Sequence, residues 1–197
     1  MSSKSTHTTK SQAKSADAKP VDAQPETSRV QDFREHLLPF SFMKESPIQN
    51  TANIDLDVEG LVSVLSLIKV AVGITRPIAV QLVDSPEMVR LNTIFRNCPE
   101  NTDVLTFPSG LDDPLPLGDI AVCVEYAQRQ ATLRGVSMIN EITALLVHAC
   151  LHLVGYDDIA DEDRTAMQHK MNEVGEQIGI PFDGEWTSIL HQDYEHS

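Results

Sequence analysis

Apolar positions along the middle of the chain repeat at two spacings, one typical of helices and one typical of strands. A three-to-four-residue spacing over 61–72, ended by Gly73, predicts an amphipathic helix. Apolar runs bounded by Pro, Gly or Asp instead predict strands, because β-branched and aliphatic residues crowd into each run. These strand segments are "PIAVQLVD" (77–84), "TDVLTFP" (102–108) and "LGDIAVCV" (117–124).

Capping residues mark four further helices. The tripeptide Ser-Pro-Glu at 85–87 supplies an N-cap, a proline for the first turn and an early acid, so we expect a helix to about residue 96. Ser137 caps a helix that runs to residue 153, and two more helices are expected over 125–134 and 161–178. This order of elements predicts one α+β domain, a small mixed sheet with helices packed on it.

The two ends of the chain have a different composition from the middle. Residues 1–45 open with a Ser/Thr/Lys/Ala/Pro-rich stretch that has almost no large apolar residue. Such a segment buries too little surface to order itself, so we predict a disordered N-terminal extension. We place the folded domain at 46–185 and a flexible C-terminal tail at 186–197.

Composition narrows the class of protein. The 197 residues are 41% hydrophobic and 22% charged, which is typical of a soluble globular chain. No apolar run approaches the roughly 20 residues of a membrane span, and no secretory signal opens the chain. The three scattered cysteines favour a reducing cytosol over a disulfide framework. We therefore expect a cytoplasmic protein with no membrane partner.

Charge restricts the choice of partner. The net charge is -14, and because residues 1–30 carry five bases and three acids, the rest of the chain carries -16. Such a body repels polyanions at long range. A DNA-binding domain is not expected, and a role on RNA would need a local basic groove or a cationic partner.

The segment "LLVHACLHLVGYDD" (145–158) holds the candidate chemistry. His148 and His152 are four residues apart, so they share one face of a helix and can reach one metal ion. Gly155 can end that helix and let the chain bring Asp158 back towards the pair. A histidine pair at this spacing is also found simply at the polar edge of a core. The glycine turn and the acid favour a metal site formed by His148, His152 and Asp158.

The full spacing, H-x-x-x-H-x-x-G-x-x-D, resembles that of the metzincin proteases, whose third ligand is usually histidine. The glutamate that serves those enzymes as general base is missing, because Ala149 occupies its position. A metal site therefore survives without the protease chemistry. Cys150 points away from the histidines and is expected to be a small buried hydrophobe.

Three blocks in order carry a more specific resemblance. "LNTIFRNCPENTDVLTFP", "LGDIAVCVEYAQRQA" and "VHACLHLVGYDD" are similar to the motifs of the YbeY family of endoribonucleases, over about 52–180. The resemblance implies a metal-dependent, single-strand-specific endoribonuclease, with zinc held by three histidines. It also implies maturation of the 16S rRNA 3′ end, ribosome quality control, a ribosomal small-subunit partner and a bacterial cytoplasmic location.

Carried over residue by residue, two ligands of the family fall on His148 and His152. The third falls on Asp158, where the family has histidine, and a family arginine falls on Arg96. Asp is an accepted zinc ligand, so we expect one zinc ion. The added negative charge makes bound water less acidic and could favour manganese or another divalent metal. The alternative is a drifted site in a ribosome-assembly factor that binds the small subunit or its proteins without hydrolysis.

The roles of the remaining polar residues stay open. Arg96 is expected to hold the scissile phosphate as a catalytic residue, although an isolated arginine at a helix end more often forms a surface salt bridge. Asp103 either closes a turn or supports a ligand histidine. Asp157 either orients a ligand or closes its own turn.

Overall fold

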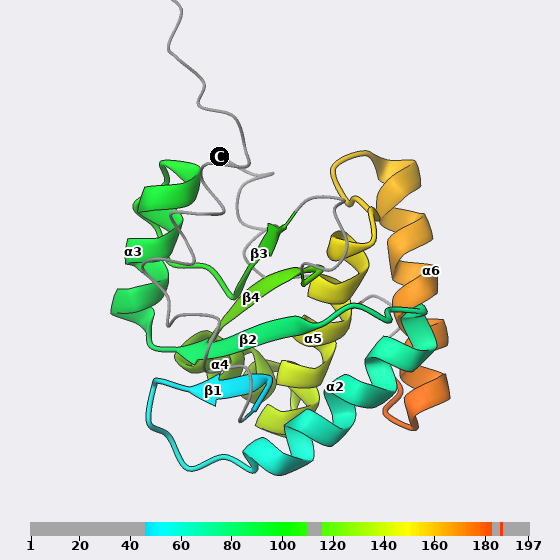
Figure 1. Ribbon diagram of the computed structural model, residues 1–197, viewed down its shortest axis with the longest axis horizontal. Helices are drawn as coiled ribbons and strands as arrows, with labels where there is room; N and C mark the ends of the chain where they lie inside the picture. The colour runs from blue at the N-terminus through cyan, green and yellow to red at the C-terminus, as the bar shows by residue number, and fades with distance from the viewer. Residues whose placement is uncertain (1–45, 110–115, 183–185, 187–197) are drawn as a thin grey trace, which may run out of the picture.

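A four-stranded mixed sheet forms the centre of the computed structural model, which describes residues 46–109, 116–182 and 186 (Figure 1). The strand order is β1-β2-β4-β3. Strands β1, β2 and β4 are parallel, and β3 is antiparallel to β4. The strands are β1 (Ile48–Asn50), β2 (Ile78–Val83), β3 (Val104–Pro108) and β4 (Gly118–Cys123).

In the described part of the chain five helices surround this sheet, and the sequence predicted each of them. Glycines in the left-handed conformation end three of the helices, with φ of 82° at Gly73, 67° at Gly135 and 75° at Gly179. The α+β class and the mixed sheet are confirmed. The helices are α2 (Val58–Val72), α3 (Ser85–Arg96), α4 (Val124–Arg134), α5 (Met138–Leu153) and α6 (Asp161–Ile178).

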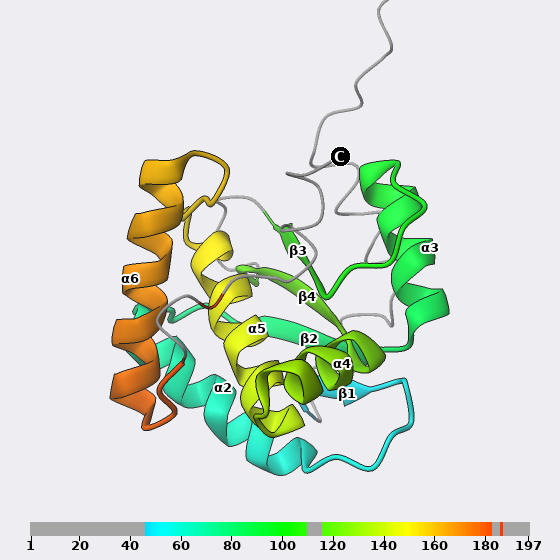
Figure 2. The same ribbon diagram turned by 180° about the vertical axis from the view of Figure 1, so that it is seen from behind.

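Side chains along β4 alternate between the two faces of the sheet, and each face has its own hydrophobic core. Ile120 and Val122 face the larger core, which α2, α5 and α6 cover, whereas Ala121 and Cys123 face a smaller one with Met88 of α3. The sheet therefore has helices on both faces, and α3 and α6 lie at opposite sides of the molecule in both views (Figures 1 and 2).

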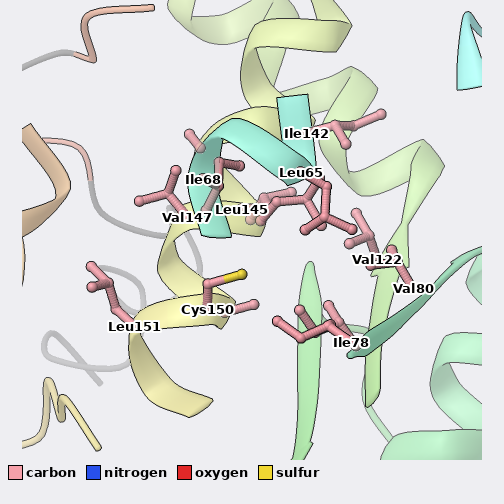
Figure 3. Packing of buried hydrophobic residues seen from close by; sticks show 14 of the residues in the cluster. Leu65, Ile68, Ile78, Val80, Val122, Ile142, Leu145, Val147, Cys150 and Leu151 are labelled. Atoms are coloured by element: carbon pink, nitrogen blue, oxygen red, sulfur yellow. The ribbon is translucent and has the colours of Figure 1, made fainter. Parts of the chain in front are cut away.

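Helix α5 is buried on almost every side, which fixes the element that carries both candidate histidines. Its residues meet Leu65 and Ile68 of α2 and the sheet residues Ile78 and Val80 (Figure 3). A fully buried Leu or Ile contributes about 1.5–3 kcal/mol, so this packing holds the helix firmly. Among the described residues no single helix is long and apolar enough to span a membrane. Helices α4 and α5, which are bent by 113° relative to each other, reach that length and apolar composition only when taken together.

Gly118 sets the distance between the end of α5 and the sheet. A Cβ at this position would lie 2.5 Å from Cδ2 of Leu153 and 2.7 Å from the carbonyl oxygen of Phe107. Only glycine lets the last residue of α5 pack directly on the start of β4. The glycine of the "LGDI" block thus serves the placement of the helix that carries the histidines.

Three local expectations differ from the structure. Asp84, not Ser85, caps α3, because its carboxylate accepts the Glu87 N–H at 2.9 Å. The three-residue strand β1 was not predicted, because it is too short to show a period. Trp186 was placed in the flexible tail, yet it is 5% exposed and belongs to the larger core. The predictions for 1–45 and 187–197 lie outside the described residues.

Candidate metal centre

The turn after α5 brings the third candidate ligand back to the helix. Gly155 has φ of 97°, its N–H donates to the carbonyl of His152 at 3.0 Å, and the Tyr156 N–H donates to that of Leu151 at 3.0 Å. This pair of bonds is the Schellman motif, which reverses the chain at a left-handed residue. The predicted glycine stop is therefore confirmed, and the reversal directs Asp158 towards the histidines.

The three candidate ligands lie together. Their ligand atoms are all within 4.8 Å of one another. The two Nε2 atoms of His148 and His152 are 3.1 Å apart. Asp158 places Oδ2 at 3.7 Å from the first Nε2 and Oδ1 at 3.8 Å from the second. All three side chains are partly buried, so the cluster reaches the surface.

These distances fit a single tetrahedral ion. Two nitrogens bonded to zinc at about 2.0–2.1 Å in a tetrahedron stand about 3.3 Å apart. The observed 3.1 Å between the Nε2 atoms is close to that spacing, Oδ2 and Oδ1 of Asp158 lie 3.7 and 3.8 Å from one nitrogen each, and one ligand atom from each residue lies within 4.8 Å of the others. Two neutral imidazoles and one carboxylate are accepted zinc ligands. Three protein ligands leave a fourth position open, which is the arrangement of a catalytic site.

The orientation of His152 is set by the turn itself. Its Nδ1 lies 3.0 Å from the carbonyl oxygen of Tyr156. A carbonyl oxygen only accepts, so Nδ1 must carry the proton and Nε2 of the neutral ring has the free lone pair. The same turn that returns Asp158 thus fixes the ligand tautomer of His152.

Two further contacts hold Asp158 in the loop. Its N–H donates to Oδ1 of Asp157 at 2.8 Å, and its carbonyl accepts from Nε of Arg164 at 3.3 Å. Asp157 is exposed, and the bond it accepts closes the turn. Of the two roles considered for Asp157, the geometry favours closure of the turn.

Sequence reasoning missed Trp186, which packs against His148, and Glu141, which Trp186 contacts. The Trp186 ring centroid lies 5.5 Å from that of His148, and its Nε1–H donates to Oε1 of Glu141 at 3.2 Å. Glu141 is 1% exposed, and burial raises the pKa of its carboxyl although Arg134 and the indole lower it. The one available signal was compositional, because Trp186 is the only tryptophan of the chain.

The other predicted residues are not part of the group of three candidate ligands. Arg96 is exposed in the last turn of α3, whose side of the molecule is opposite α6 (Figure 2). Asp103 is buried, and its carboxylate accepts from the Val104 N–H at 2.8 Å and from Gln130 at 3.3 Å. These bonds favour the turn role among the two considered for Asp103. Burial raises the pKa of the Cys150 thiol to about 12, as befits a small hydrophobe.

Comparison with known proteins places most of the chain in one family. A family model described as endoribonuclease YbeY matches residues 43–179. A protein named endoribonuclease YbeY from Pseudomonas putida strain F1 is 37% identical over 119 residues, covering 57% of this chain and 76% of its own. A protein of the same name from Caldicellulosiruptor bescii is 33% identical over 148 residues, which cover 67% of this chain and 94% of that protein.

A solved structure agrees with this comparison. The solution structure of TM1509 from Thermotoga maritima superposes with a TM-score of 0.50 at 27% identity. It covers 76% of this chain and 96% of its own. The similarity therefore extends across nearly all of that protein.

Proposed function

The chain belongs to the endoribonuclease YbeY family, and from this membership we propose that it is a metal-dependent endoribonuclease that acts on single-stranded RNA in rRNA processing. The observation that carries the proposal is the cluster of His148, His152 and Asp158, which lies in the last family block. The family membership supplies the reaction class, and the cluster supplies a place for its metal.

The protein's own residues have separate tasks in this reaction. The three ligands would hold one divalent ion, zinc in our proposal, which supplies a Lewis acid and an acidified water when bound. The Tyr156 carbonyl keeps the proton of His152 on Nδ1, so Nε2 stays free as a ligand. Arg96 would bind the scissile phosphate through its planar, permanently charged guanidinium.

We further propose that the substrate is the 3′ end of precursor 16S rRNA and that the enzyme takes part in ribosome quality control in the bacterial cytoplasm. The net charge of -14 supports a contact with basic small-subunit proteins, because opposite charges steer such an encounter. The same charge favours a second candidate, an assembly factor that binds the small subunit without cleaving RNA.

Cleavage of labelled RNA separates these functions. The protein, purified without a His-tag, should cut a single-stranded oligonucleotide and leave the matching duplex intact. His152→Ala should lose both metal and cleavage. Asp163→Asn is the matched control, because it removes one negative charge at an exposed position of the same acidic stretch. Stoichiometric metal with no cleavage by the wild type, together with retained binding to small subunits, would favour the assembly factor.

A further inference from the structure

Trp186 lies beyond the family-matched residues 43–179 and yet lies against the helix that carries the histidines. It contacts α5 at Glu141 and at His148. These two residues are seven apart, which is about two helical turns, so they share one face of α5. A single indole can therefore touch a buried carboxylate at one end and a metal ligand at the other.

The indole is held in place from two directions. Its Nε1–H donates to Oε1 of Glu141, and the guanidinium carbon of Arg134 lies 5.1 Å from the ring centroid of Trp186. Nε of Arg134 is also 3.6 Å from Oε2 of Glu141. The buried carboxylate thus has one N–H donor and one cation nearby. Rotating the indole away would remove that donor from a carboxylate that is 1% exposed, which is strongly unfavourable.

The two histidines are supported differently. The turn after α5 fixes the ring of His152, whereas the ring of His148 packs on Trp186 at an interplanar angle of 57°. The side chain of His148 is 12% exposed and that of His152 is 25% exposed. The indole therefore lies against the His148 ring, beside the contact that this ring makes with His152 at 4.5 Å between centroids, and limits its rotation and hydration.

We propose that Trp186 is a positioning residue for His148 and so supports the metal centre. This inference rests on the proposed metal-dependent function. Partners that orient ligands change metal affinity by roughly 10- to 100-fold when removed. Glu141 and Arg134 act one step further out, because they hold the indole.

The first test measures zinc affinity by competition with a chromogenic chelator, on the full chain. Trp186→Ala should weaken zinc binding roughly 10- to 100-fold. Trp186→Phe, which keeps a ring but loses the N–H, should fall between it and the wild type. Leu91→Ala is the control for lost core packing, because Leu91 is fully buried on α3 in the smaller core. Its affinity should stay within about twofold of the wild type.

A spectroscopic readout identifies a change of geometry at the ion. The visible absorption of bound Co²⁺ should differ between the wild type and Trp186→Ala and be restored in part by Trp186→Phe. Unchanged zinc affinity and an unchanged Co²⁺ spectrum in Trp186→Ala would overturn the positioning role and leave the metal centre standing. A wild type that binds neither ion would overturn both the positioning role and the proposed function.

A measurement on the wild type covers the case in which Trp186→Ala does not fold. Trp186 is the only tryptophan, so all indole emission comes from this position. One equivalent of Co²⁺ should quench the emission, and a chelator should restore it. If Co²⁺ binds and the emission does not change, the indole is not beside His148 and the proposal is overturned.

Discussion

Replacing Asp158 by asparagine tests whether this residue is the third metal ligand. The substitution keeps the size of the side chain and removes its charge. The carboxylate oxygens lie 3.7 and 3.8 Å from the two histidine Nε2 atoms, so an ion bound by both rings lies within coordinating reach of Asp158. Losing a coordinating charge weakens binding at least as much as losing an outer partner, roughly 100-fold.

The loss of affinity predicts a change in thermal stability. At free zinc of about 100 times the wild-type Kd, binding stabilises the folded state by about 2.7 kcal/mol. A 100-fold weaker variant gains only about 0.4 kcal/mol at the same free zinc. For a chain of this size the zinc-induced rise in Tm is then about 5–10 °C for the wild type and about 1–2 °C for Asp158→Asn.

Circular dichroism melts in zinc-buffered and metal-free solution measure this difference. Asp163→Asn removes the same charge from an exposed position five residues away and should keep the full zinc-induced rise. The reasoning is refuted if Asp158→Asn keeps the wild-type rise. It is equally refuted if the two variants lose the rise together, because net charge and not coordination would then be the cause.

Three further substitutions test other parts of the molecule. Arg96→Ala should lower kcat/KM for single-stranded RNA and leave the metal content unchanged. The cleavage assay and elemental analysis of the same samples measure the two quantities. A loss of metal in this variant would contradict a phosphate-binding role. Gly118→Ala should lower the urea midpoint by the equivalent of about 1–3 kcal/mol, because the new Cβ meets Leu153 and the Phe107 carbonyl. The folded state raises the pKa of Glu141 above its ordinary value of about 4.5. The stability that Glu141 contributes is therefore fully present below about pH 4.5 and is lost as the pH rises through the folded-state pKa. The free energy of unfolding of the wild type, measured with urea, should therefore fall relative to that of Glu141→Gln as the pH rises. Parallel dependence of the two free energies on pH would contradict this.

Local signals account for what the sequence predicted well. Each helix end at Gly73 and Gly135 depends on one residue that adopts positive φ, so composition and spacing were sufficient. The ligand cluster is also local, because a helical turn relates His148 to His152 and the Schellman turn at Gly155 relates them to Asp158.

Long-range contacts account for what the sequence did not predict. Trp186 is buried because Glu141, 45 residues earlier, accepts its N–H, and no local pattern reports that pairing. Strand β1 exists because three residues pair with β2 some 30 positions later. The cap of α3 was misplaced by one residue because Asp84 and Ser85 are both good N-caps. Their backbone conformations, not their identities, decide which of them serves.

The identity of the third ligand also bears on how RNA would reach the site. A divalent ion held by His148, His152 and Asp158 leaves a net charge of about +1, whereas three neutral histidines would leave about +2. The surrounding chain is strongly acidic, with a net charge of -14, so the ion has less positive charge to offer a polyanion. The attraction must then come from elsewhere on the chain, for which Arg96 is our candidate, or from a basic partner bound to the acidic surface. Asp158 and the acidic composition therefore support, through separate arguments, the proposed contact with basic small-subunit proteins.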